Sequence, residues 1–333
     1  MEEFEVFTIA GTGKKGDKDG PGNEANFKYP YGIAVQNDGT IIIADSLNNK
    51  IRGIDLDGNV FTIAGTGEPG DKDGPGNEAT FSNPYGIAIR DDGTIIVTDS
   101  YNHKIRGIDL DGNVFIIAGT GEVGDKDGHE ATFYYPCGIA IRNDGTIIVA
   151  DSYNNKIRGI DLDGNVYTIA GPGEIGNKDG PGNEATFYHP GGITIKPDGT
   201  IIVVDTYNRK IREIDLDGNV HTISGTGEQG DKDGPGNEAT LNNPYGISIR
   251  DDGTIIVSDT YNHKIRGIDS YGNVITIVGT GVRGDKDGTG NEATFYHPQG
   301  IAIRDDGTII VSDTRNNKIR GIRLKKLVKS AIE

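Results

Sequence analysis

One unit of about 54 residues is repeated six times along the chain. The pattern Asp-Ser/Thr-x-Asn-x-Lys-Ile-Arg begins at six positions, which are Asp45, Asp99, Asp151, Asp205, Asp259 and Asp313. The starts lie 54 residues apart, except that Asp151 follows Asp99 by 52. No linker interrupts the series, so the sequence predicts one domain over residues 1–325 and a short basic tail at 326–333. A repeat of this length is typical of propellers and solenoids.

Each unit contains four short strand patterns and no helical periodicity. In the second unit these are residues 86–89, 94–97, 104–108 and 114–118. Asp-Gly turns separate the first strand from the second and the third from the fourth, which is a strong hairpin signal. The second strand is apolar on both faces, as expected for a strand between neighbouring sheets. Four antiparallel strands per repeat describe a propeller blade.

The two ends of the chain distinguish a ring from an open solenoid. The last unit stops after residues 318–322, so its fourth strand is missing. The chain begins with residues 6–11, which match the fourth strand of the first unit at residues 60–65. Pairing of this first strand with the last blade would remove the free sheet edges that a solenoid leaves open. The sequence therefore predicts an all-β, six-bladed β-propeller in which the N-terminal strand completes the last blade.

These strand patterns resemble those of the NHL-repeat family. The similarity rests on Pro-x-Gly-Ile-Ala-Val, a Gly turn, an apolar strand ending in Asp, and Asn-x-Lys-Ile-Arg-x-Ile, first seen at residues 30–54 and matched with small changes in every unit. The resemblance implies a propeller. It also implies roles that range from protein-binding, RNA-binding and sensor modules to divergent lyases and metal-dependent hydrolases. The fold does not choose among them.

Composition and charge limit the classes of partner and the compartment that we expect for this chain. The net charge of −17 argues against nucleic acid or an anionic membrane as partner. No apolar run approaches the roughly 20 residues of a membrane helix. The acidic N-terminus lacks an apolar signal core, and the single cysteine, Cys137, cannot form an internal disulfide. We expect a soluble, cytoplasmic monomer.

The loops divide into two groups that we expect on opposite faces of the ring. The loop face carries the long crossovers between blades and the turns between second and third strands. The turn face carries only the tight Asp-Gly turns. Because long loops on a rigid scaffold commonly carry binding residues, we expect the binding surface on the loop face.

The crossovers are rich in acidic residues, for example Asp71, Asp73 and Glu78. We expect most of the net charge on the loop face, where it would attract a basic partner. Such oxygen ligands are weak candidates for Ca²⁺ sites. However, Lys72 stands between the two Asp residues and Asn177 replaces the first Asp in one unit. We therefore interpret the crossovers as loops built by Asx-turns and Gly, and we predict no metal and no cofactor.

Positions that vary within the copied framework are the candidate binding residues. Such residue types are common in recognition surfaces. In the turns they are Tyr101, His103, Tyr153, Asn155, Tyr207, Arg209, Tyr261 and His263, and after the blade proline they are Tyr31, Tyr85 and Tyr245. Drift at exposed sites after repeat amplification, or diversification of a constructed sequence, explains the same variation equally well.

Nothing in the repeats suggests catalysis. The inner strands, such as Gly-Ile-Ala-Val, offer no acid, base or metal ligand, five of the six histidines fall in loops, and Cys137 has no fixed His partner. The sequence predicts a non-catalytic scaffold that binds a protein or peptide, and the acidic crossovers favour a basic one. The alternatives are a multivalent carbohydrate-binding propeller, since copied blades would give copied pockets, and a repeat protein of amplified, consensus or reconstructed repeats without a specific activity.

Overall fold

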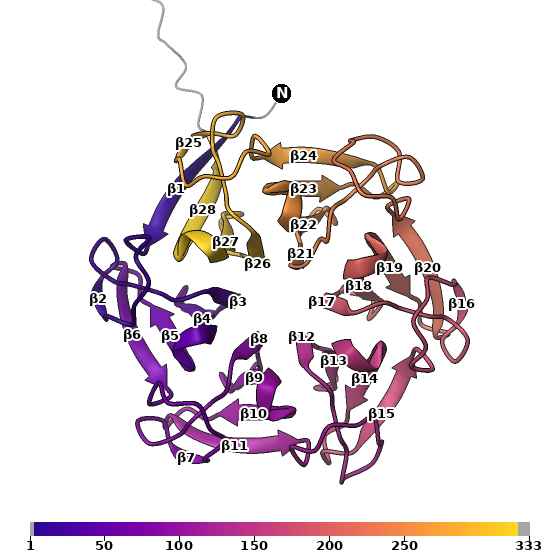
Figure 1. The fold of residues 1–333 in the computed structure, drawn as a ribbon, viewed down its shortest axis with the longest axis horizontal. Coiled ribbons are helices and arrows are strands. Elements are labelled where there is room, and N and C mark those ends of the chain that lie inside the picture. The colour runs from indigo at the N-terminus through magenta and orange to yellow at the C-terminus, as the bar shows by residue number, and fades with distance from the viewer. Residues whose placement is uncertain (1–2, 326–333) are drawn as a thin grey trace, which may run out of the picture.

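Six antiparallel sheets surround a central axis in the computed structural model, which describes residues 3–325 (Figure 1). The prediction of an all-β, six-bladed propeller is confirmed. The tail at residues 326–333 lies outside the described residues. Within residues 3–325, no helix is both long enough and apolar enough to cross a membrane.

Blades 1 to 3 contain four principal strands each, which follow one another from the axis outward, and blades 1 and 2 add a short rim strand. Blade 1 consists of β3 (Pro30–Val35), β4 (Ile41–Asp45), β5 (Lys50–Ile54), β6 (Asn59–Ala64) and the rim strand β2 (Gly20–Pro21). Blade 2 consists of β8 (Pro84–Ile89), β9 (Ile95–Asp99), β10 (Lys104–Ile108), β11 (Asn113–Ala118) and the rim strand β7 (Gly74–Pro75). Blade 3 consists of β12 (Pro136–Ile141), β13 (Ile147–Asp151), β14 (Lys156–Ile160) and β15 (Val166–Ala170).

Blades 4 to 6 repeat this order. Blade 4 consists of β17 (Pro190–Ile195), β18 (Ile201–Asp205), β19 (Lys210–Ile214), β20 (Asn219–Ser224) and the rim strand β16 (Gly180–Pro181). Blade 5 consists of β21 (Ile247–Ile249), β22 (Ile255–Asp259), β23 (Lys264–Ile268) and β24 (Val274–Val278). Blade 6 consists of β26 (Pro298–Ile303), β27 (Ile309–Asp313), β28 (Lys318–Leu324), β1 (Phe4–Ala10) and the rim strand β25 (Gly288–Thr289).

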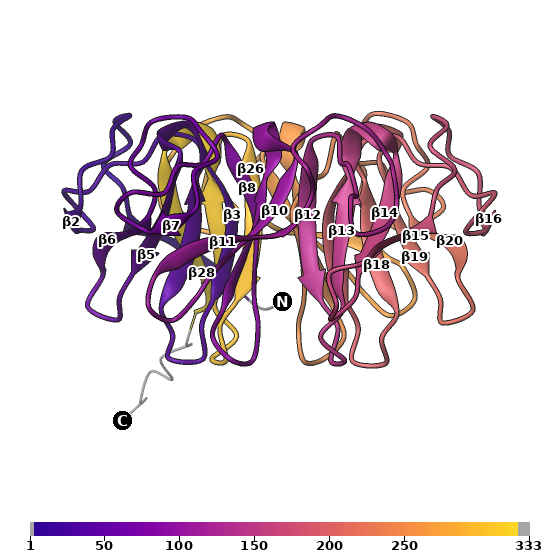
Figure 2. The same ribbon diagram turned by 90° about the horizontal axis from the view of Figure 1, so that it is seen from below.

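A single 3-10 turn joins the second strand of every blade to the third. These turns are η1 (Ser46–Asn48), η2 (Ser100–Asn102), η3 (Ser152–Asn154), η4 (Thr206–Asn208), η5 (Thr260–Asn262) and η6 (Thr314–Asn316). In the side view they lie along one edge of the ring, and the hairpin turns project from the opposite edge (Figure 2). The loop face and the turn face are therefore opposite faces of one disc.

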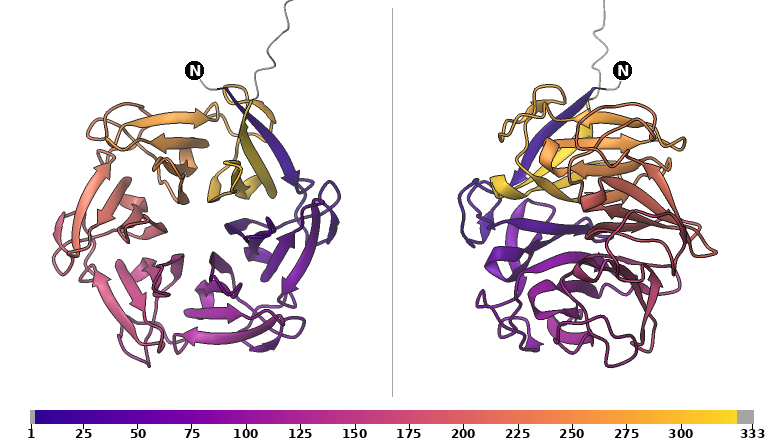
Figure 3. Two further views of the ribbon diagram at one scale, coloured as in Figure 1. Left: turned by 180° about the vertical axis from the view of Figure 1, so that it is seen from behind. Right: turned by 45° about the vertical axis from the view of Figure 1, so that its right-hand side comes forward.

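The ring closes through the first strand of the chain. β1 pairs antiparallel with β28, from Phe4 opposite Leu324 to Ala10 opposite Ile319. The indigo strand lies beside the yellow strands of the last blade (Figures 1 and 3). Val6 is buried in the core between blades 5 and 6. The predicted closure by the N-terminal strand is confirmed.

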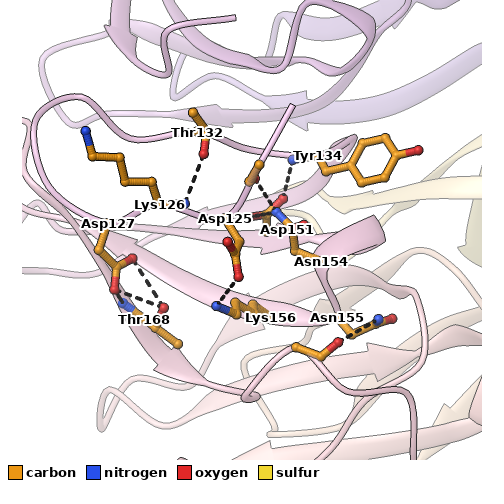
Figure 4. A network of polar contacts seen from close by, with 12 residues as sticks. Asp125, Lys126, Asp127, Thr132, Tyr134, Asp151, Asn154, Asn155, Lys156 and Thr168 are labelled. Atoms are coloured by element: carbon orange, nitrogen blue, oxygen red, sulfur yellow. Dashed lines mark hydrogen bonds and ion pairs between the residues drawn. The ribbon is translucent and has the colours of Figure 1, made fainter. Parts of the chain in front are cut away.

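A buried polar cluster fixes the loop-face end of every blade, and blade 3 illustrates it (Figure 4). Asp151 ends β13 and is fully buried. Its Oδ1 accepts the backbone N–H of Tyr134 at 2.8 Å, and its Oδ2 accepts from Asn154 Nδ2 at 2.8 Å and from Arg158 Nη1 at 2.7 Å. A buried carboxylate surrounded by donors and paired with a cation has its polar atoms satisfied.

The arginine of this cluster also holds the crossover in place. Arg158 Nη2 donates to Asp127 Oδ1 at 2.6 Å and to the Lys126 carbonyl at 2.9 Å, and its Cζ lies 5.2 Å from the centre of the Phe133 ring. The equivalent arginines pair with both equivalent aspartates in the other five blades; they are Arg52, Arg106, Arg212, Arg266 and Arg320.

The remaining crossover carboxylates are also paired. In blade 3, Lys156 Nζ lies 2.8 Å from Asp125 Oδ2, and Lys126 Nζ lies 3.2 Å from Glu130 Oε2. The same two kinds of pair recur around the ring, and only the first is missing in blade 4, where Asn177 replaces the aspartate. The crossovers therefore bring carboxylates to the loop face together with the lysines and arginines that offset them.

The expectation that most of the net charge lies on the loop face is consequently wrong. The Lys and Arg of the third strand reach the crossover from the blade beneath it and offset its carboxylates. On the turn face, most carboxylates, such as Asp111 and Asp163, have no Lys or Arg partner within residues 3–325. The excess negative charge lies mainly on the turn face, and the charge argument for a basic partner at the loop face is lost.

Removal of residues 1–11 should destabilise the ring. Without β1, the third strand of blade 6 becomes an unpaired sheet edge, so we expect a lower melting temperature or self-association. Calorimetry and analytical ultracentrifugation measure these effects, and a chain shortened by residues 326–333 is the control. A chain without residues 1–11 that melts like the full chain and stays monomeric would contradict closure by β1.

Calcium should not stabilise the protein measurably. The crossover carboxylates already accept from Lys and Arg, so an added ion would have to displace these cations. The melting temperature should be the same in millimolar Ca²⁺ and in excess chelator. A large rise with Ca²⁺ that the chelator reverses would show a site that binds the folded state and would refute the prediction.

Candidate functional site

The residues that follow the blade proline close the axial channel at its loop-face end. Tyr31 and Tyr85 stack with ring centres 4.3 Å apart, Tyr245 lies 5.2 Å from Tyr85, and the Tyr85 hydroxyl donates to Gln299 Oε1. Together with Cys137 and the first isoleucine of each inner strand, they line a cavity of about 90 Å³. The sequence predicts the three tyrosines as loop-face binding residues, and the structure places them half-buried at the loop-face end of the channel.

The titratable side chains that line this cavity are uncharged at neutral pH. Burial raises the pKa of Tyr31 to about 12 and raises the pKa values of Tyr85, Tyr245 and Cys137 above their ordinary ranges. These groups are therefore protonated at neutral pH, and no His, Asp or Glu lines the cavity. Residues 3–325 also contain no group of three or more His, Cys, Asp or Glu placed to hold a metal ion.

A continuous row of aromatic rings crosses the loop face over blades 2 to 4. We call it the aromatic arc, and its members are Tyr101, Tyr135, Tyr153, His189 and Tyr207. Successive ring centres lie 5.0, 4.6, 4.3 and 4.8 Å apart. The three tyrosines from the 3-10 turns remain 44% to 52% exposed. The arc therefore joins three blades into one accessible apolar surface.

Two members of the arc stand in a backbone conformation that disfavours them. Tyr135 and His189 precede the blade proline with φ of 51° and 48°, in the left-handed region where Asn is better tolerated. Blades 2 and 5 have Asn83 and Asn243 at this place. The position before the proline varies among the repeats, which marks it as a loop-face recognition position, although these two rings are not among the candidate binding residues named from the sequence.

Four other candidate residues hold neighbouring blades together. Asn155 is 5% exposed; its Oδ1 accepts the backbone N–H of His189 at 3.0 Å, and its Nδ2 donates to the Gly173 carbonyl at 3.3 Å. We call this arrangement the blade clasp. Arg209, at the equivalent position in blade 4, makes only the second of these two hydrogen bonds: its Nη1 donates to the Gly227 carbonyl at 3.3 Å.

Histidine replaces asparagine in two of the six clasps. His103 Nδ1 accepts the backbone N–H of Tyr135 at 3.2 Å, and His263 Nδ1 accepts that of His297 at 3.3 Å. A ring nitrogen that accepts must be unprotonated, so both clasps require a neutral imidazole. Burial lowers the pKa of His103 and of His263, which favours this form.

A second aromatic group lies over blades 5 and 6. The Tyr261 and His297 ring centres are 4.4 Å apart, and Tyr296 lies 5.2 Å from His297. Arg315 takes the place that Tyr occupies in blades 2 to 5, with its Cζ 5.5 Å from the centre of Tyr296. The loop face therefore carries aromatic rings over blades 5 and 6 as well, and there an exposed arginine lies against them.

Known proteins share both the repeat and the ring. The NHL repeat pattern matches residues 81–108, 133–160 and 295–322. The chain is 32% identical over 288 residues to Protein SUPPRESSOR OF QUENCHING 1, chloroplastic, from Arabidopsis thaliana, covering 80% of this chain and 27% of that protein. It is 31% identical over 320 residues to NHL repeat-containing protein 2 from Gallus gallus, covering 84% of this chain and 44% of that protein. The chain spans less than half the length of these relatives.

Several solved structures have the same ring of blades although their sequences are distant from this one. A Bacteroides thetaiotaomicron protein of unknown function aligns with a TM-score of 0.77 at 21% identity, covering 98% of this chain and 77% of that one. A streptogramin B lyase aligns with a TM-score of 0.60 at 16% identity, covering 97% and 98%, and a gluconolactonase from Xanthomonas campestris with 0.64 at 14%, covering 96% and 89%. Identities this low show a common fold alone. Together with the repeat matches and the six-bladed ring, the relatives place the chain among the NHL-repeat β-propellers.

Proposed function

We propose that the chain is a non-catalytic binding scaffold that docks a protein or peptide on its loop face, with the aromatic arc as the main contact. The observation that carries the proposal is the continuous row of exposed rings over blades 2 to 4. Tyrosine buries a large area at a low cost in side-chain entropy, which suits it to a docking surface. NHL relatives of this chain include proteins named only for the repeat, and none of these names supplies a partner.

The backbone under the arc supports the same proposal. Left-handed φ values cost an ordinary residue about 1–2 kcal/mol relative to Gly, and they cost Asn less. Tyr135 and His189 occupy such positions in blades 3 and 4, next to copies of the unit in which Asn stands there. Tyr29 and His297 share this conformation in blades 1 and 6, so the strained aromatic residues lie around the loop face as a whole, which favours a role for that face in recognition.

The channel supports the non-catalytic part of the proposal. An active site needs unlike groups in unlike roles at one place. The channel instead offers phenols and one thiol that burial keeps protonated, and its other lining residues are mainly Gly and Ile. The enzymes that share the fold are too distant to transfer an activity.

Shortening two arc tyrosines should weaken binding without unfolding the ring. We expect Tyr153→Ala combined with Tyr207→Ala to weaken binding of a partner captured by the wild-type chain at least about tenfold, a typical loss for aromatic anchors. Calorimetric titration measures the affinity, and thermal melting checks the fold.

The matched control is Tyr271→Ala, because Tyr271 is 89% exposed on the turn face. This substitution removes the same side chain from the opposite side of the disc and should leave binding unchanged. A partner that responds to Tyr271→Ala and ignores the arc variant would place the docking surface on the turn face.

The histidine clasps should make two blade junctions sensitive to acid. The pKa values of His103 and His263 are lowered in the folded state, so their contribution is complete above the unfolded value of about 6.5 and is lost as the pH falls below it. The variant His103→Asn with His263→Asn installs the residue that blades 1, 3 and 6 already use. We expect the melting temperature of the variant to rise relative to that of the wild type as the pH falls below 6.5. A difference in melting temperature that is the same at all pH values would contradict the clasp.

A further inference from the structure

Two neighbouring blades reverse the charge at the tip of the crossover. The tip is the pair of residues that follows the opening Gly-Thr-Gly or Gly-Pro-Gly. In blades 2 to 5 its first residue is acidic, and these residues are Glu68, Glu122, Glu174 and Glu228. In blade 1 the tip is Lys14-Lys15, and in blade 6 it is Val282-Arg283. All eight of these residues are exposed.

The cations at these tips differ from those lower in the crossovers. Lys50 and Lys318 lie 2.7 Å from Asp17 and Asp285, which offset their charge. Within residues 3–325, Lys14, Lys15, Arg283 and Arg315 form no ion pair with any carboxylate. Their charge is therefore available to a ligand in solvent.

Aromatic rings position three of the four. Lys15 Nζ lies 4.9 Å from the centre of Tyr29, and the Cζ atoms of Arg283 and Arg315 lie 6.0 and 5.5 Å from the centre of Tyr296. Arg315 Nη1 also donates to the Tyr296 hydroxyl at 3.3 Å. Cation–π contacts of this kind hold a charged group in place while it stays exposed.

The titratable neighbours respond to this concentration of positive charge. The hydrogen bond from Arg315 lowers the pKa of Tyr296. Burial, with smaller contributions from Arg315 and His263, lowers the pKa of His297 to about 4. Burial likewise lowers the pKa of His263, with smaller contributions from Arg283 and Arg315. The histidines stay neutral beside the cations, so the arginines and lysines carry the charge.

We propose that the basic patch, formed by Lys14, Lys15, Arg283 and Arg315 with Tyr29 and Tyr296, binds a short acidic segment of a protein partner. The inference rests on the proposed function, because it states which kind of partner segment binds the part of the loop face over blades 6 and 1. Arginine pairs with carboxylates in a two-point geometry, and the lysines at the neighbouring tip supply point charges.

The surroundings of the patch favour a short peptide over a nucleic acid. The tips on either side carry Glu68 and Glu228, so a polyanion that runs on past blades 6 and 1 meets like charge. The chain as a whole carries −17, which also opposes a long polyanion.

The repeats supply the variant that tests the patch. Lys14→Glu with Lys15→Pro and Val282→Glu with Arg283→Pro install the tip that blade 2 already has, Glu68-Pro69, and Arg315→Tyr installs the residue of blades 2 to 5. The bridge from Lys15 to Phe27 and that from Pro69 to Phe81 are equivalent, so this backbone accepts proline. The single variant Arg315→Tyr is the smaller change if the combined one melts lower.

The probe is a short fluorescent oligoglutamate peptide, followed by anisotropy at low and at raised salt. We expect the wild-type chain to bind it, the affinity to fall with salt, and the combined variant to bind at least about tenfold more weakly. Absence of binding to the wild type, or equal binding to the variant, would overturn the proposal.

Two further measurements separate the alternatives. Oligouridylate RNA that binds more tightly than the peptide, and is lost in the same variant, would overturn the proposal in favour of a nucleic-acid site. The variant Tyr153→Ala with Tyr207→Ala should bind oligoglutamate normally. If the captured partner depends on the arc while oligoglutamate does not bind, the acidic-peptide proposal fails and the proposed function stands. If oligoglutamate binds as expected while the partner ignores the arc, the proposed function of the arc fails and the acidic-peptide site stands.

Discussion

One buried arginine in each blade connects the segments that give the loop face its shape. Arg158 contacts the aspartate that ends the second strand, the aspartate and a carbonyl of the crossover, and the ring of Phe133. Desolvating such a charge is expensive, and removing one partner of a buried pair typically costs about 3–5 kcal/mol. The arrangement persists because the guanidinium satisfies several acceptors at once. Each crossover is therefore fixed to its own blade, and the residues at its tip and at its end project from a rigid frame.

This frame explains which features could be predicted from the sequence. Hairpins, strand order and closure depend on contacts within one unit or on the match between residues 6–11 and 60–65, and the sequence displays both. The distribution of charge depends on pairs such as Asp125 with Lys156, which a count along one segment does not reveal. The position of Tyr85 depends on how closely the inner strands approach. A side chain at Gly86 would collide with the Cys137 carbonyl of the next blade, so the neighbouring tyrosine lies in the channel.

The candidate site was harder to predict for the same reason. Asn155 and His103 vary among the repeats as a recognition residue would, yet both accept a backbone N–H of the next blade. Variation at that position is limited to side chains that can make part of the clasp, and Arg209 keeps only its bond to Gly227. Tyr135 and His189 belong to the arc because of a left-handed backbone that residue type alone does not indicate. Variable positions in a copied fold therefore include structural contacts as well as surfaces free for a partner.

The asymmetry of the ring has a further consequence at the point where the chain closes. The basic patch joins Lys14 and Lys15, which follow β1, to Arg315, which precedes β28. Those two strands form the pairing that closes the ring. Nearby, the Tyr29 backbone N–H donates to Asn317 Oδ1 at 3.1 Å and links blade 1 to blade 6. A ligand that bridges these cations contacts segments from both ends of the chain only when the ring is closed. Because it would bind the closed state alone, its binding free energy would add to closure, so that docking and ring integrity become one coupled equilibrium.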